Sequence, residues 1–399
     1  MDKKKILSWC LFDFANSSYS AVIASVIFPV YYATKIVGDA SGLGDLWWGR
    51  AVSLSMLIVA LSSPLLGGIA DYSGIRKRML FVFVLLCVIS VASFSALKEG
   101  DILEGFILVV IANIAMEWSV IFYNSFLPLI APRDYLGRVS SWGFGTGYFG
   151  SIVSLIAGLY LVQKGHYDLT WLFISFFFFI FSLPLFFTMP GDEKRESFLH
   201  SARKGMRYII ESFKNLWRQR HMRWFLIAYF LYIDGVNTVI AFSGIYASVT
   251  LGFETKELII LFIIVQFTAL LGSFAFARLT DTWGPGRVIE LSLLLWSTVS
   301  SGAFFVDSKK GFLLIAALAG IGLGTIQASS RAYFSRFIPH GKESEYFGVY
   351  SMVGKSSAIL GPVLFGVISS LTGSQRYAIL TVLLFFLSGL ILMHKLHKL

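Results

Sequence analysis

Five ionisable residues lie inside apolar stretches that are long enough to cross a membrane. They are Asp13, Glu117, Asp234, Arg331 and Lys355. A charge at the centre of a spanning helix costs about 3 kcal/mol even on the insertion scale, so these side chains are expected to face one another or water. Such charges suit a small zwitterion, because a carboxylate can meet Arg331 or Lys355 while an ammonium meets Asp13 or Asp234.

The five charges do not balance, because three are acids and two are bases. One acid is therefore left without a cation, and burial raises the pKa of an unpaired carboxyl whereas a nearby cation lowers it. Glu117 lies near the middle of its span, and the matching span of the second half carries no acid. We therefore predict that Glu117 is the proton-responsive group.

Further polar residues accompany the charges at helical spacing. The stripes are Asp13, Asn16, Ser17 and Ser20; Asn113, Glu117 and Asn124; Asp234, Asn237 and Thr238; and Gln327, Ser330 and Arg331. Residues three, four or seven apart share one helix face, so each stripe is expected to line a wet surface. The predicted substrate-binding residues are Asp13, Asn16, Asp234, Asn237, Gln327, Arg331 and Lys355.

Two alternatives to substrate binding remain open for these stripes. Ser and Asn side chains also serve as interhelical hydrogen bonds in membrane bundles. The four charges other than Glu117 lie toward one end of their spans, which also suits an inner gate held by ion pairs.

The elements that must position these residues are membrane spans. Of the 399 residues, 56% are hydrophobic and 14% are charged, against about 25% charged in a soluble domain. Apolar blocks of about 20 residues recur from end to end, the length at which a helix crosses about 30 Å of hydrocarbon. We predict an all-α membrane protein with twelve transmembrane helices at residues 7–36, 47–71, 79–97, 104–131, 138–163, 169–189, 223–248, 257–279, 288–306, 311–338, 346–371 and 376–394.

One long polar stretch, residues 191–222, divides the spans into two groups of six. We expect an N-terminal six-helix bundle at 1–190, a cytoplasmic linker at 191–222 and a C-terminal six-helix bundle at 223–399. Within the linker, residues 201–217 have the pattern of a basic amphipathic helix. Such a helix suits the membrane surface, and the alternative is a partner-binding segment.

The formal net charge of +10 would suggest nucleic acid in a soluble protein, but its distribution points elsewhere. Lys and Arg gather on one set of alternate loops, at Lys3–Lys5, Arg76–Arg78, 194–223, Lys395 and Lys398. Because positive charge marks the cytoplasmic side, both termini are predicted to be cytoplasmic. We expect membrane lipids as neighbours and no nucleic acid partner.

The two halves repeat one another, as in many transporter folds. Asp13 and Asn16 in the first span match Asp234 and Asn237 in the seventh. The loops after the second and eighth spans also match, because Asp71 and Gly74 recur as Asp281 and Gly284 at a common spacing of 210 residues.

At these residues the chain resembles the major facilitator superfamily over its full length. That family's loop signature is matched by Gly67, Asp71, Gly74, Arg76 and Lys77, although Ile75 stands where a basic residue is usual and the second copy lacks its first Gly. The resemblance implies two pseudo-symmetric six-helix bundles, alternating access, and a gating role for this loop and for Asp281. It also implies that spans 1, 4, 7 and 10 line the central cavity.

Four further motifs resemble the branch of vacuolar amino-acid effluxers of autophagy and their bacterial relatives. The first motif runs from Trp9 to Ser17 and the second from Tyr232 to Gly235. The third runs from Gln327 to Arg331, and the fourth is the pair Gly354 and Lys355. The branch favours an amino-acid-like solute and a bacterial inner membrane location, with the direction of transport left open.

Several other patterns are set aside. The string 145–150 satisfies a dinucleotide fingerprint, but it lies inside a span. Gly143, Gly147, Gly150, Ser154 and Gly158 are instead a small-residue seam for close helix packing. Gly354, Lys355 and Ser356 resemble the end of a phosphate loop, but the first Gly of that motif is out of place.

All six histidines lie in loops or at termini, so neither a metal site nor a cofactor is expected. Gly361 and Pro362 predict a bend in the eleventh span.

We therefore expect a monomeric, non-enzymatic secondary transporter of a small polar organic solute, with proton coupling as a further hypothesis. The alternatives are a proton-coupled exporter of amphipathic drugs or lipid-like compounds, and a transporter-like sensor that binds without transport.

Overall fold

The structure is a computed structural model that describes residues 2–38, 42–193 and 213–397, which form helices joined by turns and loops, with no strand among them. Within these described residues, eleven helices are long and apolar enough to cross a membrane. A bent pair, Lys3–Val26 and Phe28–Ile36, makes a twelfth span with an angle of 40° at the break. The prediction of an all-α multi-pass membrane protein is confirmed. Of the amphipathic helix predicted at 201–217, residues 201–212 lie outside the described residues. Residues 213–217 are helical.

The helices pack as two compact units, each of which takes in one short segment from the other half of the sequence. Unit 1 comprises Met1–Ala131, Thr146–Ile210 and Pro339–Met352. Unit 2 comprises Pro132–Gly145, Glu211–Ile338 and Val353–Leu399. The bundles predicted from the sequence, at 1–190 and 223–399, do not include this exchange of segments between the two halves. The exchanged segments are the starts of two long helices, so each of these helices contributes to both units.

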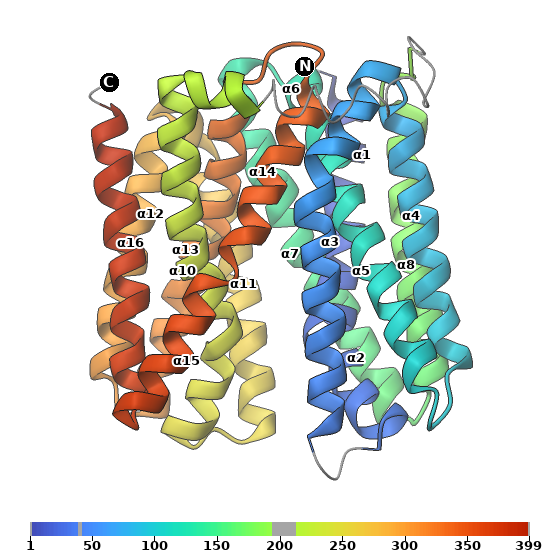
Figure 1. The fold of residues 1–399 in the computed structure, drawn as a ribbon, viewed down its shortest axis with the longest axis vertical. Coiled ribbons are helices and arrows are strands. Elements are labelled where there is room, and N and C mark those ends of the chain that lie inside the picture. The colour runs from blue at the N-terminus through green and yellow to red at the C-terminus, as the bar shows by residue number, and fades with distance from the viewer. Residues whose placement is uncertain (1, 39–41, 194–212, 398–399) are drawn as a thin grey trace. The chain divides into compact units, whose positions relative to one another are not determined.

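Unit 1 contains the first six spans and the start of α14 (Figure 1). Its elements are α1 (Lys3–Ser18), η1 (Tyr19–Val26), α2 (Phe28–Tyr31), η2 (Tyr32–Ile36), α3 (Leu43–Ser73), α4 (Arg76–Ser93), η3 (Phe94–Ala96), α5 (Ile102–Ser125), α6 (Leu127–Ile130), most of α7 (Leu136–Gln163), α8 (Tyr167–Thr188) and the start of α14 (Glu343–Ser357). Helix α5 packs on both α3 and α4, and α8 packs on α1 and α4. The core includes Trp9 and Phe12, whose rings stack on Tyr123 with centroids 4.6 and 4.7 Å away.

Unit 2 contains the last six spans and the start of α7. Its elements are η4 (Arg133–Tyr135), α10 (Arg220–Leu251), α11 (Thr255–Thr282), α12 (Pro285–Phe305), α13 (Lys309–Ser335), the end of α14, α15 (Leu360–Thr372) and α16 (Gln375–His397). Helix α13 packs on α11 and α12, and α16 packs on α10, α12 and α15 (Figure 1). Trp296 stacks on Phe386 in the core, with ring centroids 5.1 Å apart.

The first and eleventh spans are interrupted. In the first span, two π-helical stretches flank the four-residue helix α2, whose first turn holds Pro29. The Ser25 hydroxyl bonds to the carbonyl of Ser20, five residues back, at 2.7 Å. In the eleventh span, α14 ends at Ser357 and α15 begins at Leu360, so the helix is interrupted next to Gly361 and Pro362, where the sequence predicts a bend. Wide helical turns and breaks of this kind occur often at functional sites in membrane proteins.

The small residues of α7 allow a close approach to α1 within unit 1. A Cβ added at Gly150 would lie 2.1 Å from the carbonyl oxygen of Phe14. One added at Gly147 would lie 2.7 Å from the hydroxyl of Ser17. Both positions confirm the predicted small-residue seam, because any side chain there would push α1 away.

Candidate functional site

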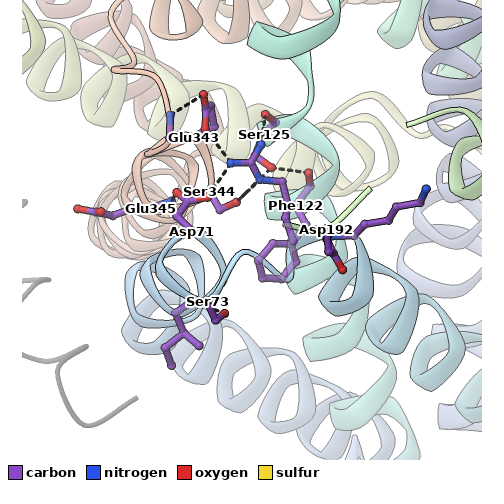
Figure 2. A network of polar contacts seen from close by, with 12 residues as sticks. Asp71, Ser73, Phe122, Ser125, Asp192, Glu343, Ser344 and Glu345 are labelled. Atoms are coloured by element: carbon purple, nitrogen blue, oxygen red, sulfur yellow. Dashed lines mark hydrogen bonds and ion pairs between the residues drawn. The ribbon is translucent and has the colours of Figure 1, made fainter. Parts of the chain in front are cut away.

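The loop after α3 is organised around one guanidinium. A single nitrogen of Arg76, Nη2, lies 2.7 Å from Asp71 Oδ1 and 2.7 Å from Glu343 Oε2 (Figure 2). Its Nε donates to the hydroxyl of Ser344 at 2.8 Å, and Nη1 donates to the carbonyl of Ser125 at 3.4 Å. Both carboxylates are nearly fully buried. Two acids therefore share one cation that also ties α4 to α5 and α14.

Asp71 also binds the backbone at the start of α14. Its Oδ2 accepts a hydrogen bond from the amide of Glu345 at 2.8 Å. A carboxylate at this position satisfies an amide in the first turn and complements the positive end of the helix dipole. Gly67 permits the contact, because a Cβ there would lie 2.1 Å from the carbonyl oxygen of Ser344. On α14 itself, Gly348 lies one turn after Ser344, and a Cβ added there would lie 2.4 Å from the carbonyl oxygen of Ser63 on α3.

The remaining residues of the loop signature fix the junction between α3 and α4. Gly74 ends α3 with φ +67°, a left-handed conformation that glycine adopts without strain. The amide of Lys77 donates to Asp192 Oδ1 at 2.7 Å, and its Nζ donates to the carbonyl of Met189 at 2.9 Å. The amide of Arg78 donates to Asp192 Oδ2 at 3.0 Å. Asp192 therefore caps the start of α4 from the segment that follows α8.

The second copy of the loop shows the same arrangement within unit 2. Asp281 Oδ1 accepts a hydrogen bond from the amide of Gly137 at 2.8 Å, at the start of α7. The backbone amide of Arg138 also donates to Asp281 Oδ1. The side-chain Nε of Arg138 forms an ion pair with Asp281 Oδ2 at 3.0 Å. Burial lowers the pKa of the nearby Arg336 guanidinium, while the charges of Asp281 and Asp134 act in the opposite direction.

The two copies correspond at the acid and at the glycine that follows it. Asp71 and Asp281 are 210 residues apart, and each binds the start of a helix from the other half of the sequence. Gly74 and Gly284 both have positive φ, at +67° and +89°. The sequence repeat of the two loops therefore corresponds to a contact that occurs twice, in which an aspartate binds a backbone amide at the start of a helix.

A second polar group lies between α1 and α5. Asp13 is 7% exposed, and its Oδ2 accepts a hydrogen bond from the Tyr123 hydroxyl at 2.7 Å. Its Oδ1 accepts one from the Asn16 side chain at 3.3 Å. The indole of Trp9 donates to the carbonyl of Tyr123 at 3.0 Å. The predicted pair of Asp13 and Asn16 is therefore brought together, and two aromatic rings hold it in place.

Glu117 lies on α5 and is half-buried. Its charge acts on the phenol of Tyr19, which donates to the side-chain oxygen of Asn113 at 2.6 Å. Asn113 and Glu117 are one helical turn apart, as the predicted stripe requires.

In unit 2, Arg331 is held against the start of α7. It is 3% exposed, and its Nε and Nη2 donate to the hydroxyl and the carbonyl of Ser140 at 3.0 and 2.8 Å. The guanidinium carbon lies 4.1 Å from the centroid of the Phe144 ring. Neighbouring Ser330 shares a hydrogen bond of 2.7 Å with the buried hydroxyl of Tyr232. The Arg331 guanidinium is therefore fixed in orientation by bonding on its edge and stacking on its face.

Asp234 is fully buried beside the break in the eleventh span. Both of its carboxylate oxygens accept from the amide of Gly361, at 3.0 and 2.9 Å. This amide belongs to the first turn of α15, so Asp234 caps the second half of a broken helix. The other predicted residues of unit 2, Asn237, Gln327 and Lys355, are half-buried.

Sequence reasoning missed several residues of the loop clusters, namely Arg138, Asp192, Glu343, Ser344 and Glu345. A signal was present, because Pro132 precedes the start of α7 and Pro339 precedes the start of α14 at a spacing of 207 residues. The same spacing pairs Arg138 with Glu345.

Across residues 2–38, 42–193 and 213–397, no three His, Cys, Asp or Glu side chains are grouped to hold a metal ion.

Comparisons with known proteins agree with this architecture. Residues 50–398 match the family described as "Vacuole effluxer Atg22 like". The uncharacterized MFS-type transporter YxiO of Bacillus subtilis (strain 168) is 30% identical over 97% of this chain and 93% of its own length. Autophagy-related protein 22 of Saccharomyces cerevisiae (strain ATCC 204508 / S288c) is 25% identical over 91% of this chain and 75% of its own. The human organic anion transporter MFSD10 has a TM-score of 0.81 at 14% identity, covering 98% of this chain and 100% of that one.

The cap at the broken eleventh span can be tested with Gly361→Ala. A Cβ there would lie 1.9 Å from the hydroxyl oxygen of Thr238 and 2.8 Å from Asp234 Oδ1. We expect a lower apparent melting temperature for the purified protein, corresponding to about 1–3 kcal/mol of overpacking. Adding Thr238→Ala removes the closest atom and is expected to restore part of the loss.

Gly366→Ala is the matched control on the same helix, because a Cβ there meets nothing within 4 Å. Equal melting temperatures for Gly361→Ala and Gly366→Ala would contradict the cap.

Proposed function

The chain belongs to the Atg22-like vacuole effluxer family of major facilitator transporters, and from that premise we propose that it carries a small, amino-acid-like solute by alternating access. The family resemblance drawn from the sequence motifs is confirmed. The fold and the family are those of transporters and not of enzymes. The substrate class is our inference from the buried charges.

The observation that supports an amino-acid-like solute is the fixed orientation of Arg331. Two hydrogen bonds to Ser140 and the stacking on Phe144 hold its planar guanidinium in a buried setting. A guanidinium recognises a carboxylate through paired, charge-assisted hydrogen bonds. In our proposal, the solute's carboxylate binds Arg331 or Lys355.

The solute's ammonium group requires an acid. We assign it to Asp13 or Asp234, with Asn16, Asn237 and Gln327 supplying neutral hydrogen bonds. The carboxylate of Asp13 is oriented by the hydroxyl of Tyr123 at 2.7 Å, as a preorganised contact requires. The bonds of Asp234 to Gly361 lead us to expect that an ammonium at Asp234 would also act on the break between α14 and α15.

Radiolabelled amino-acid counterflow in proteoliposomes tests the substrate assignment. Arg331→Gln is expected to weaken apparent affinity about 10- to 100-fold, because a hydrogen bond to a charged group contributes about 1.5–3 kcal/mol. Arg331→Lys retains the charge but not the planar fork, and we expect an intermediate loss. Binding without flux in the unmodified protein would identify a sensor. Neither binding nor flux with any amino acid would redirect the search to amphipathic compounds.

We further propose that transport is coupled to protons through Glu117. This residue is a half-buried acid on α5, close to Tyr19 and Asn113. Glu117→Gln mimics the protonated acid, so flux through this variant is expected to lose its response to a pH gradient. The measurement is uptake with and without an imposed gradient, and an unchanged response would exclude Glu117.

The loop clusters are our proposed gate. Gly67, Asp71, Gly74, Arg76 and Lys77 form the first copy and Asp281 marks the second, and each acid binds a helix start. For access to alternate, we infer that these contacts form and break in turn.

Gly67→Ala tests the gate, because a Cβ at this position would lie 2.1 Å from the carbonyl oxygen of Ser344 and prevent α14 from packing on α3. We expect at least a tenfold loss of flux, or about 1.4 kcal/mol, in protein that still reaches the membrane. Gly49→Ala on the same helix is the control, since its Cβ meets nothing within 4 Å. Normal flux in Gly67→Ala would contradict the gate.

A further inference from the structure

Glu345, in the first turn of α14, carries a buried carboxylate that the loop cluster does not use. The residue is 1% exposed, and neither Oε1 nor Oε2 accepts a hydrogen bond from any residue in the described part of the chain. Figure 2 shows its side chain pointing away from Glu343 and Ser344, with no contact drawn to its carboxylate. Its Cγ would lie 4.0 Å from a Cβ placed at Gly68, so the side chain packs on α3.

The charges around Glu345 leave it without a counterion. Arg76 is already shared by Asp71 and Glu343, each at 2.7 Å. The charges that act on Glu345 are those of Lys342 and Asp71, and they have opposite signs. Lys342 is half-buried, and within the described residues it forms no ion pair with Glu345. The cluster thus holds three carboxylates around one arginine.

The second copy of the loop shows what a charge-balanced arrangement looks like. The residue related to Glu345 by the 207-residue spacing is Arg138, whose Nε lies 3.0 Å from Asp281 Oδ2. Asp281 therefore meets a base at the start of α7, whereas Asp71 meets an acid at the start of α14. At these equivalent positions, the first copy of the contact carries an acid and the second carries a base.

An ionised carboxylate in this position would be strongly disfavoured, because burial removes it from water and neither a cation nor a donor replaces the water. The neutral acid avoids most of that penalty. Separation of α14 from α3 would return the side chain to water, where a glutamate is ionised at neutral pH.

We propose that Glu345 is a proton-binding site whose occupancy is coupled to the packing of α14 on α3. The acid keeps its proton while the two helices are packed. When they separate, the O–H bond breaks, the proton passes to water, and the carboxylate keeps the electron pair. This proposal rests on the gate proposed above, and it makes the packing of α14 on α3 depend on pH, separately from the coupling of transport to protons assigned to Glu117.

The sign of the effect is fixed by this linkage. The packed arrangement binds one proton more than the separated one, so rising pH favours separation by up to about tenfold per pH unit. Glu117 is a different group on α5, and its replacement is not expected to change the separation of α14.

The experiment follows amide hydrogen exchange in the purified full-length protein from mildly acidic to mildly alkaline pH. Rates are corrected for the pH dependence of intrinsic exchange, and the readout is the peptide at the start of α14, whose exchange reports local opening. In the unmodified protein, protection is expected to fall as pH rises. In Glu345→Gln, protection is expected to stay high at every pH.

Glu343→Gln is the matched control, since it makes the same chemical change two residues away. It removes one partner of Arg76 and leaves Glu345 in place, so exchange is expected to rise at every pH while the pH dependence persists. Glu345→Met supplies a second, apolar replacement of similar length that is also expected to abolish the pH dependence.

A pH dependence that survives in both Glu345→Gln and Glu345→Met would overturn the proposal, as would its absence from the unmodified protein. The exchange measurement needs no substrate. A failure of the amino-acid counterflow assay is therefore distinguishable from a failure of the proton site.

Discussion

The cost of burying a charge away from water governs the arrangement of this protein. In an apolar surrounding, a charge persists only if a counterion or several dipoles replace its water. Arg76 is met by two carboxylates, Asp281 by Arg138 and two backbone amides, and Asp13 by the hydroxyl of Tyr123. The helices are positioned to supply those partners, so each charge also ties two or more helices together.

Helix starts supply many of these partners. Asp71 binds the first turn of α14, Asp281 that of α7, and Asp234 that of α15. An amide in the first turn lacks a partner within its own helix and carries part of the positive end of the dipole. A buried acid and a helix start therefore satisfy each other without a second charged side chain.

Glycine determines where these contacts can form. At Gly67, Gly150 and Gly361 an added Cβ would lie within about 2 Å of an oxygen on the neighbouring segment. Because the driving force for helix association in a membrane comes from close packing and hydrogen bonding, the small residues set which helices approach. Glu345 and Arg138 stand at matching positions of these two contacts and carry opposite charges, and the unpaired carboxylate of Glu345 is the basis of the proton site proposed at the start of α14.

The sequence by itself determined the class, the spans, the repeat and the interruption of the eleventh span near Gly361, because each follows from local hydrophobicity, helical spacing or glycine and proline chemistry. The helical spacing also placed Asp13 and Asn16 on one helix face, and in the structure their side chains are joined by a hydrogen bond. Only the tertiary structure decided the partners of the charges. Arg76 meets Glu343 across 267 residues, and Asp234 meets the amide of Gly361 across 127. The unpaired setting of Glu345 likewise depends on how α14 crosses α3, which is a property of packing that no local pattern in the chain encodes.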